Sequence, residues 1–447
     1  MPASDLIVSV SGIRGVVGES LTPEPVGRFA AALGTFLGGG NVVLSRDSRP
    51  SGEMLKHAVV AGLLSVGCKV EDIGIAATPT VGIAVRTLHA AGAIQITASH
   101  NPAPWNGLKL FGGDGAVLPA NQGQQVRMTY DSQAFARVGW DKIGSVRVPP
   151  DVTDDHLRLV SDHVSAAVIA SRGFRVFLDA NAGAGGPLGM RLLGELGCEV
   201  VQYGCEPTGQ FLHEPEPTPA NLTEVAPWVA RHEAAVGFVL DPDSDRLSLI
   251  DETGTCVSEE LTLALAVKFR LRSVTGPVVV NMSTSRVIED IAVAAGCDFH
   301  RSAVGEANVV ELMRSTNAVI GGEGNGGVID PRIGWVRDPF IGMGQILNLM
   351  ADERKPLSQL ISELPTYAML KTKFTVPKEK LPAALVALTA RFPDAKANTV
   401  DGLRLDGPDW WLHVRGSNTE PVVRVIAEAP TAARATDLCR DAGALFG

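Results

Sequence analysis

The chain has 447 residues, of which 45% are hydrophobic and 20% charged, and its formal net charge at pH 7 is −10. One hydrophobic core rarely supports a chain of this length, so we expect two to four domains of ~100–200 residues each. The negative charge argues against a nucleic-acid surface, apolar stretches such as residues 58–66 are too short to span a membrane, and six scattered cysteines fit a reduced, cytoplasmic protein.

The first segment, residues 6–150, alternates expected strands with expected helices. Residues 42–44 are apolar and β-branched and run into a polar turn at residues 45–50, which is typical of a strand that ends in a functional loop. One helix should begin at the threonine and proline of positions 22 and 23, and a second should cover residues 51–66. This alternation predicts a parallel or mixed sheet with ligand loops at the carboxyl ends of its strands.

A polar turn at residues 97–102, here called the serine loop, follows the expected strand at residues 93–96. The turn carries Ser99 and His100, and Lys109 follows a short distance beyond it. Such a turn is either a loop that holds a nucleophile or an ordinary solvated turn. Arg14, bracketed by glycines after the first apolar strand, is likewise either a functional cation or a surface arginine.

A second segment begins after a proline-rich, acidic linker near residues 149–155 and a helix expected over residues 156–170. Its apolar strand at residues 235–240 runs into the aspartate loop, residues 241–246. The alternate carboxylates of this loop repel one another unless a cation or protons compensate, which favours a divalent metal with hard oxygen ligands. A calcium-binding loop is excluded because Arg246 stands where the turn requires glycine, and a solvated acidic turn remains the alternative.

Two further polar turns occur later in the chain. The glycine-rich loop, residues 321–327, carries Glu323 and Asn325, whose donors and acceptors suit sugar hydroxyls unless the loop is simply a flexible turn. From Tyr367 a smaller α+β segment follows, and its arginine turn, residues 415–421, suits a dianionic phosphate or is a surface turn. The candidate donors of this last turn and the strand after it are Arg415, Ser417, Asn418, Thr419 and Arg424.

Considered together, the four loops resemble the motifs of the α-D-phosphohexomutase family of phosphoglucomutases, phosphomannomutases and phosphoglucosamine mutases. The serine loop is similar to the family's phosphoserine loop, and the aspartate loop to its metal loop. The glycine-rich loop is similar to the sugar-recognition loop, and the arginine turn to the phosphate-binding loop. The four motifs occur in the family's order and span nearly the whole chain.

The resemblance implies three similar α/β domains with mixed sheets, and a smaller α+β C-terminal domain, around a central cleft. We expect these domains at residues 1–150, 151–255, 256–366 and 367–447. In this order they would supply the phosphoserine, the metal site, sugar recognition and phosphate binding. A single sequence leaves the oligomeric state open.

The resemblance also implies a role for each candidate residue. Ser99 would carry the phosphoryl group and, through a phosphate oxygen, bind Mg²⁺ together with Asp241, Asp243 and Asp245. Lys109 and Arg14 look like the proton-transfer and charge-stabilising pair, and His100 like an orienter of the serine loop. The substrate-binding residues would be Arg246, Glu323, Asn325, Arg415, Ser417, Asn418, Thr419 and Arg424.

The expected activity moves a phosphoryl group between the 1- and 6-positions of a hexose phosphate, with a hexose 1,6-bisphosphate as intermediate and activator. We favour phosphoglucosamine mutase, with phosphomannomutase or phosphoglucomutase as the alternative, because residues 322–327 together with residues 11–15 look more like the bacterial and archaeal members assigned that role. Asn325 departs from the serine that many bacterial members have at this position, which leaves the sugar preference open. The loop at residues 302–308 resembles the family's specificity loop. A phosphosugar phosphatase and a non-catalytic phosphosugar-binding protein are the remaining alternatives.

Overall fold

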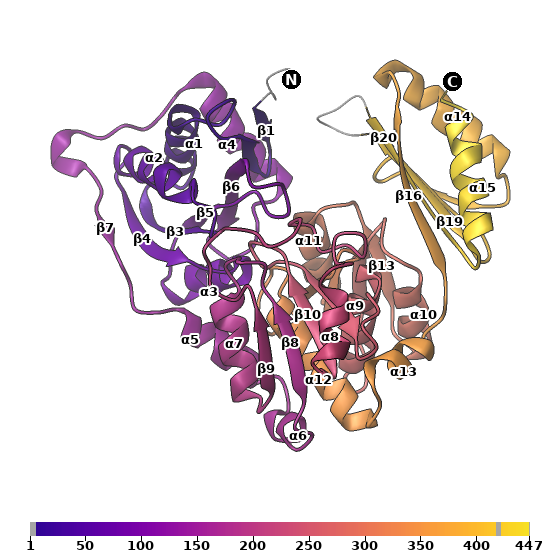
Figure 1. The fold of residues 1–447 in the computed structure, drawn as a ribbon. Helices are drawn as coiled ribbons and strands as arrows, with labels where there is room; N and C mark the ends of the chain where they lie inside the picture. Colours follow the sequence, from indigo (N-terminus) through magenta and orange to yellow (C-terminus); the bar gives the residue numbers. More distant parts are fainter. Residues whose placement is uncertain (1–5, 417–421, 447) are drawn as a thin grey trace.

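The computed structural model describes residues 6–416 and 422–446, which form four domains in succession along the chain (Figure 1). The first three contain mixed β-sheets with helices packed on them, and the fourth contains an antiparallel sheet. This is the fold class that the sequence predicted. Within the described residues, no helix combines the length and the apolar character that crossing a bilayer requires.

The first domain is built on a seven-stranded sheet of order β1-β2-β6-β5-β3-β4-β7. Strands β3, β4, β5 and β7 run parallel, while β6 pairs antiparallel with β5 and β2. The strands are β1 (Ile7–Ser9), β2 (Gly12–Val16), β3 (Gly40–Arg46), β4 (Cys68–Ile75), β5 (Gly92–Ile96), β6 (Trp105–Gly112) and β7 (Val146–Arg147), and the helices are α1 (Pro23–Phe36), α2 (Gly52–Leu64), α3 (Thr78–Thr87) and α4 (Ala120–Ser132).

The second and third domains share one topology. Each sheet has three parallel strands and a last strand that pairs antiparallel, in the orders β11-β10-β8-β9 and β13-β12-β14-β15. The second domain contains α5 (Thr153–Ser161), α6 (Ala166–Ala170), β8 (Arg175–Asp179), α7 (Gly186–Glu195), β9 (Glu199–Tyr203), α8 (Ala226–Arg231), β10 (Val236–Leu240) and β11 (Leu247–Asp251). The third contains α9 (Glu259–Arg270), β12 (Val278–Asn281), α10 (Val287–Ala294), β13 (Phe299–Ser302), α11 (Glu306–Thr316), β14 (Ile320–Glu323), β15 (Gly327–Ile329), α12 (Pro339–Glu353) and α13 (Leu357–Ser362).

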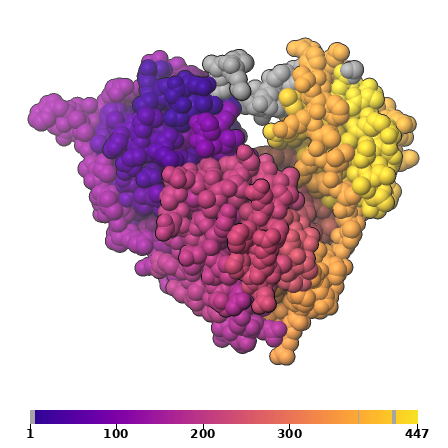
Figure 2. Space-filling view, viewed as in Figure 1, coloured from indigo at the N-terminus to yellow at the C-terminus, as the bar shows by residue number. Residues whose placement is uncertain are grey.

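The fourth domain has a five-stranded sheet of order β16-β20-β19-β18-β17 in which every pair is antiparallel. Its elements are β16 (Ala368–Thr375), α14 (Leu381–Arg391), β17 (Lys396–Asn398), β18 (Leu403–Asp406), β19 (Trp411–Gly416), β20 (Val422–Ala429) and α15 (Ala432–Gly443). Figure 2 shows a hollow between this orange-to-yellow domain and the indigo-to-purple first domain. The fourth domain therefore borders an open space rather than a continuous protein surface.

The hydrophobic cores do not correspond one to one with the four sheets. One large core joins the second and third domains, from Leu157 to Leu364, and also takes in Ala77 and Ile83 of the first domain, whereas residues of the fourth domain form a core of their own. The central strands are continuously apolar because helices bury both of their faces, as in β10, whose five residues are all buried. The second and third domains are thus one packed body, and the fourth is separately packed.

One expected helix is divided in two. The helix predicted over residues 156–170 is interrupted between α5 and α6, and the backbone N–H of Ser165 there donates to the Asn348 side-chain oxygen at 2.6 Å. Asn348 on α12 thus satisfies a backbone donor in the interruption. Helical periodicity in the sequence does not indicate such a tertiary contact.

Candidate active site

In each of the first three domains, the chemically distinctive residues lie in the connection at the equivalent position of the sheet. This connection joins the last parallel strand to its antiparallel neighbour, namely β5 to β6, β10 to β11 and β14 to β15. It holds the serine loop in the first domain, the aspartate loop in the second and the glycine-rich loop in the third. The repeated delivery of a strand into a polar loop therefore has a common structural origin.

The backbone of the serine loop is held in an uncommon conformation. Ser99 has a φ of 51°, in the left-handed region that non-glycine residues seldom adopt. Its N–H donates to Thr97 Oγ1 at 2.9 Å, and its Oγ lies 3.1 Å from Asp241 Oδ2. Backbone strain of this kind persists where surrounding contacts enforce it. Here the contacts present the Ser99 hydroxyl to the aspartate loop.

Arg49 supplies most of those contacts, although its role in the loop was missed in the sequence. The buried guanidinium pairs with Asp47 at 3.1 Å, and Asp47 also accepts from Thr97 Oγ1 at 2.7 Å. The only sequence signal was the polar turn at residues 45–50, recognised as functional but without an assigned task. The guanidinium donates to four carbonyls of the serine loop and its end, those of Ser99 (2.7 Å), Asn101 (2.6 Å), Pro102 (2.9 Å) and Trp105 (3.1 Å).

The aspartate loop gathers three buried carboxylates. Asp241, Asp243 and Asp245 each offer an oxygen, and these oxygens lie within 4.8 Å of one another. Asp241 Oδ1 also accepts from the backbone N–H groups of Asp245 and Arg246 at 3.0 and 3.1 Å, which fixes the turn. Burial and the neighbouring Asp243 and Asp245 charges raise the pKa of Asp241 well above its usual range. Asp241 is therefore the carboxylate of the cluster whose negative charge its surroundings stabilise least, since cations lower the pKa values of Asp243 and Asp245.

Lys109 reaches this cluster from β6. Its Nζ lies 2.9 Å from Asp243 Oδ2 and 2.7 Å from Asp245 Oδ2. Burial opposes the charge on the ammonium, but the two carboxylates outweigh burial and raise the pKa of Lys109. Thr78, at the start of α3, also donates to Asp243 at 2.8 Å. The ammonium is consequently protonated and held against the candidate metal ligands.

Three other candidate residues surround Ser99. His100 Nδ1 lies 3.3 Å from Ser99 Oγ, and burial together with the Arg246 and Arg14 charges lowers the pKa of His100 to about 3. Arg14, on β2, interacts electrostatically with Asp243 and Asp245, although burial lowers the pKa of Arg14. These groups place two guanidinium cations and one neutral imidazole around the serine and the carboxylates.

Glu216 of the second domain, which was not identified from the sequence, contacts both Arg246 and His100. Its Oε1 lies 3.2 Å from Arg246 Nη1 and 3.8 Å from His100 Nε2. No motif marked this glutamate, because it lies in the irregular segment between β9 and α8. It contributes a contact between the serine loop and the end of the aspartate loop.

The glycine-rich loop meets the aspartate loop through Arg337, another residue that the sequence did not single out. Arg337 lies 2.5 Å from Asp245, 3.0 Å from Glu323 and 3.3 Å from Glu306. Burial opposes its charge, but these carboxylates raise the pKa of Arg337 well above its usual value. Glu306 belongs to the loop at residues 302–308, whose contacts the sequence left open. Arg337 thereby connects that loop, the glycine-rich loop and the aspartates.

The two candidate sugar contacts of the glycine-rich loop differ in their surroundings. Glu323 Oε1 accepts from Asn281 Nδ2 at 2.8 Å and from the Gly305 N–H at 3.2 Å, so its carboxylate is held on both sides. The Asn325 side-chain oxygen is buried and has no hydrogen-bond partner among the described residues. Asn325 therefore retains an unused acceptor.

Of the arginine turn, the structure describes Arg415 and Gly416. Arg415 Nε lies 3.3 Å from Asp401 within the fourth domain, and the exposed Arg424 is its cross-strand neighbour. Asp401 also accepts from the Val304 N–H at 3.0 Å, which links this region to the loop at residues 302–308. The candidate residues Ser417, Asn418 and Thr419 lie outside the described part of the chain.

The aspartate cluster fits a divalent cation. One oxygen each of Asp243 and Asp245 is buried and lacks a hydrogen-bond partner within the described residues. A hard cation with carboxylate ligands would use such oxygens and would relieve the repulsion that raises the pKa of Asp241. The donor set is all oxygen and close together, which suits Mg²⁺.

Four family descriptions match the chain in succession. They are phosphoglucomutase/phosphomannomutase α/β/α domain I at residues 5–137, domain II at 154–254 and domain III at 259–367, followed by the C-terminal domain at 372–442. The match covers most of the chain and includes the serine, aspartate and glycine-rich loops.

Individual relatives match along nearly the whole length. A probable phosphoglucosamine mutase of Methanopyrus kandleri is 35% identical over 433 residues, covering 96% of this chain and 95% of the relative. A phosphoglucomutase/phosphomannomutase of Thermococcus kodakarensis is 37% identical over 436 residues, covering 95% of both chains. The crystal structure of a phosphoglucomutase/phosphomannomutase family protein from Burkholderia thailandensis is 28% identical, with a TM-score of 0.86 and coverage of 98% and 97%.

Proposed function

The chain belongs to the phosphoglucomutase/phosphomannomutase family of phosphohexose mutases, and on this basis we propose that Ser99 carries the phosphoryl group it transfers. The observation that carries the proposal is the 3.1 Å contact of Ser99 Oγ with Asp241, inside a buried cluster of three carboxylates. Phosphoryl transfer depends on positioning and on charge neutralisation, and this cluster supports both.

The proposed reaction has two opposite transfers. In the first, the free hydroxyl of a hexose 1- or 6-phosphate attacks the phosphorus of phosphorylated Ser99, a new O–P bond forms and the P–Oγ bond breaks. The hydroxyl proton ends on Ser99 Oγ. In the second, Ser99 Oγ attacks the other phosphate of the hexose 1,6-bisphosphate, an O–P bond to Oγ forms and the sugar O–P bond breaks. The serine proton ends on the sugar oxygen, so that phosphoserine is restored and the isomeric monophosphate is released. The same bisphosphate would rephosphorylate an enzyme that has lost its phosphate.

Lys109 and Arg14 are the groups that we assign to charge and proton handling. Lys109 is held against Asp243 and Asp245 as an ammonium, so it can return a proton to Ser99 Oγ and stabilise charge on the transferring group. Arg14 adds a cation that needs no proton exchange. His100, neutral and 3.3 Å from Ser99 Oγ, orients the hydroxyl.

We further propose that the aspartates hold Mg²⁺. The residues Asp241, Asp243 and Asp245 would bind it together with an oxygen of phosphoserine 99, and the cation would neutralise charge on the phosphoryl oxygens. Arg246 would hold the loop beside the substrate. The unpartnered oxygens of Asp243 and Asp245 support this assignment.

A mutase must hold the phosphate that is not reacting, and we assign this task to the arginine turn. Arg415 and Arg424 lie side by side on β19 and β20, where their guanidinium groups suit a dianion. Ser417, Asn418 and Thr419 would add donors from the same turn. A phosphatase needs no second phosphate site, and a non-catalytic relative would be expected to have lost Ser99 or an aspartate, so both alternatives are disfavoured.

For the sugar, we propose glucosamine phosphate, with mannose or glucose phosphate as the second candidate. The unpartnered oxygen of Asn325 offers an acceptor for a sugar ammonium or hydroxyl, and Glu323 supplies a carboxylate beside it. The Methanopyrus kandleri relative bears the name phosphoglucosamine mutase, whereas the Thermococcus kodakarensis relative bears the name phosphoglucomutase/phosphomannomutase. We place the reaction in the cytosol, since all six cysteines are free thiols.

Parallel kinetics on glucosamine, glucose and mannose phosphates test both levels of the proposal. We expect isomerisation of at least one sugar phosphate, dependent on Mg²⁺ and on a bisphosphate activator, with the highest kcat/KM for glucosamine phosphate. A higher value for mannose or glucose phosphate would select the second candidate. Release of inorganic phosphate without isomerisation would replace the mutase assignment with a phosphatase.

A further inference from the structure

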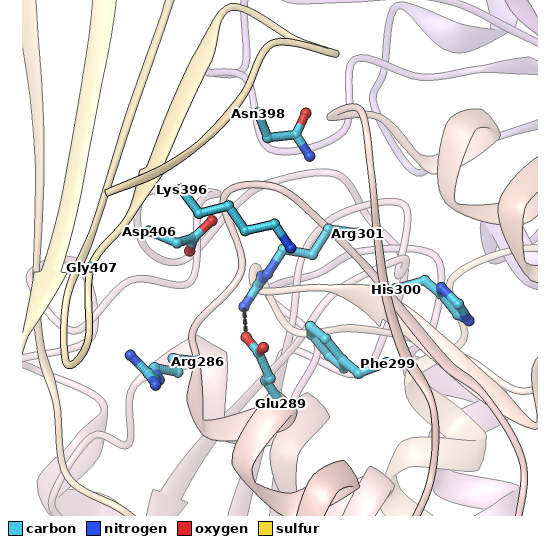
Figure 3. A pocket seen from close by; sticks show the side chains of 9 residues that line it. All are labelled: Arg286, Glu289, Phe299, His300, Arg301, Lys396, Asn398, Asp406 and Gly407. Atoms are coloured by element: carbon cyan, nitrogen blue, oxygen red, sulfur yellow. Dashed lines mark hydrogen bonds and ion pairs between the residues drawn. The ribbon is translucent and has the colours of Figure 1, made fainter. Parts of the chain in front are cut away.

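A cavity of about 480 Å³ lies between the third and fourth domains, apart from the serine and aspartate loops. The third domain contributes α10, the residue before it and β13, and the fourth contributes β17 and the end of β18 (Figure 3). The volume falls in the range of small-molecule sites, ~300–1,000 Å³. The side chains that line it are those of Arg286, Glu289, Phe299, His300, Arg301, Lys396, Asn398 and Asp406, with Gly407.

The two carboxylates that line the cavity are already neutralised. Glu289 is 3.1 Å from Arg301, a pair drawn in Figure 3, and Arg301 also donates to the Thr284 carbonyl at 2.9 Å. Asp406 pairs with the buried Arg404 at 2.8 Å. The negative charges of these two carboxylates are therefore not available to neutralise Arg286 and Lys396, the other cations that line the cavity.

Two cations on opposite sides lack strong partners. The Lys396 side chain, on β17, has no ion pair or hydrogen bond with any residue that the structure describes. Its cross-strand neighbour Asp406 pairs with Arg404 instead. Arg286 comes only within 3.8 Å of Asp290, which already accepts from Tyr367, and its buried Nε has no hydrogen-bond partner among described residues. In a chain whose net charge is −10, the cavity thus carries excess positive charge from two domains.

The electrostatics of a nearby arginine agree with this charge excess. Burial, together with the Arg301 charge, lowers the pKa of Arg404 to about 10 even though Asp406 opposes the shift. Two guanidinium groups that repel each other beside the cavity would be stabilised by an anion.

From these contacts we propose that the cavity binds a small phosphate monoester, held between Arg286 on the third domain and Lys396 on the fourth. Cations on opposite walls suit a tetrahedral dianion, whose oxygens point in several directions, better than a planar carboxylate. Asn398 can meet a hydroxyl group of the organic part, and the Phe299 ring supplies an apolar wall. The ligand would join the separately packed fourth domain to the third, at a point away from Arg415.

Hydrogen exchange measured by mass spectrometry on the full-length protein tests the proposal, with inorganic phosphate as the probe. We expect phosphate to slow exchange in peptides covering residues 286–301 and 396–407. Lys396→Glu should raise the phosphate concentration for half-maximal protection of these peptides by at least ~10-fold, since one charge-assisted hydrogen bond is lost. Peptides covering the serine and aspartate loops should respond as in the wild type.

Arg440→Glu is the charge-matched control, because Arg440 is an exposed cation on α15 of the same domain and lies outside the cavity, and it should respond like the wild type. Absence of phosphate protection at residues 286–301 and 396–407, or equal protection in Lys396→Glu, would overturn the proposal. Equal protection by chloride at the same ionic strength would also overturn it, since that outcome is general screening. None of these results depends on mutase activity, so the proposed reaction is tested separately.

Discussion

Arg337 Nη2 lies 2.5 Å from Asp245 Oδ2, so a cation two residues before α12 is in contact with a candidate metal ligand of the aspartate loop. The same guanidinium lies 3.0 Å from Glu323. Through it, the carboxylate assigned to the sugar and the carboxylate assigned to the metal share one positive charge. Movement of either carboxylate would therefore change the electrostatic interaction of Arg337 with the other.

Replacement of Arg337 should expose this dependence. Arg337→Met leaves Glu323 and Glu306 without their ion-pair partner and leaves Asp245 paired mainly with Lys109, and removal of one partner of a buried pair typically costs ~3–5 kcal/mol. We expect the free energy of unfolding to fall by that order in chemical denaturation. Mg²⁺ should raise the melting temperature of the variant more than that of the wild type, because it compensates the same carboxylates.

Arg314→Met is the control for this substitution, because Arg314 forms a solvent-exposed pair with Asp114, and such pairs contribute at most ~1 kcal/mol. Equal Mg²⁺ stabilisation of Arg337→Met and the wild type would show that Arg337 does not share charge with the metal site.

Ser99→Ala should abolish mutase turnover. The variant retains the fold but has no oxygen to carry the phosphoryl group, so we expect kcat to fall by at least ~10³-fold. Intact-mass analysis should find a phosphorylated fraction in the wild type and none in the variant. Near-normal turnover of Ser99→Ala would remove Ser99 from the mechanism.

Asp243→Asn should weaken Mg²⁺ binding, as measured by calorimetry, and lower Mg²⁺-dependent activity. The substitution keeps the side-chain shape while it removes a carboxylate whose Oδ1 has no other described partner. Asp251→Asn is a suitable control, because Asp251 lies at the far end of β11 and bonds only to its own turn among described residues. Full activity in the presence of EDTA would contradict the metal assignment.

His156→Leu should destabilise the junction of the first three domains. The fully buried imidazole lies 2.9 Å from Asp338 Oδ2 and 2.9 Å from Thr80 Oγ1, so it joins α5 to α12 and α3. Leucine leaves Asp338 Oδ2 and the Thr80 hydroxyl without the imidazole, while Asp338 Oδ1 still accepts from the N–H groups of α12, and we expect this to cost ~2–4 kcal/mol in chemical denaturation. His57→Leu, at an exposed position, should change stability by less than ~0.5 kcal/mol. A similar small change in His156→Leu would refute the bridging role.

Glu260 should make stability depend on pH. Burial raises the pKa of this carboxyl to about 7 from 4.5, despite the nearby Lys371. The folded state therefore holds a proton between these values that the unfolded state releases, so stability falls as pH rises from about 4.5 to 7. The shift corresponds to roughly 3 kcal/mol. Glu260→Gln should lack this contribution when denaturation is compared at pH 5 and pH 7.5.

Glu259→Gln removes the same charge from the adjacent position of α9, and it should keep the wild-type trend because Glu260 remains. An identical pH dependence in Glu260→Gln and the wild type would mean that Glu260 does not titrate in this window.

The sequence alone determined the fold class and the separate loops, because each depends on local chemistry. Apolar strands that end in serine, aspartate and glycine-rich turns are visible as short patterns, since a strand and its following turn occupy adjacent positions in the chain. The family resemblance then gave Ser99 and the aspartates their expected roles.

Only the tertiary structure decided which distant side chains meet. Arg49 organises the serine loop from the turn after β3, Arg337 reaches the aspartates from the segment before α12, and His156 joins three domains. No motif assigned a task to any of the three. Their effects arise from burial and from charges brought within hydrogen-bond distance by the packing of separate sheets. The local sequence pattern determines where a loop begins. The long-range contacts determine the charged neighbours, and hence the protonation states, of the residues in that loop.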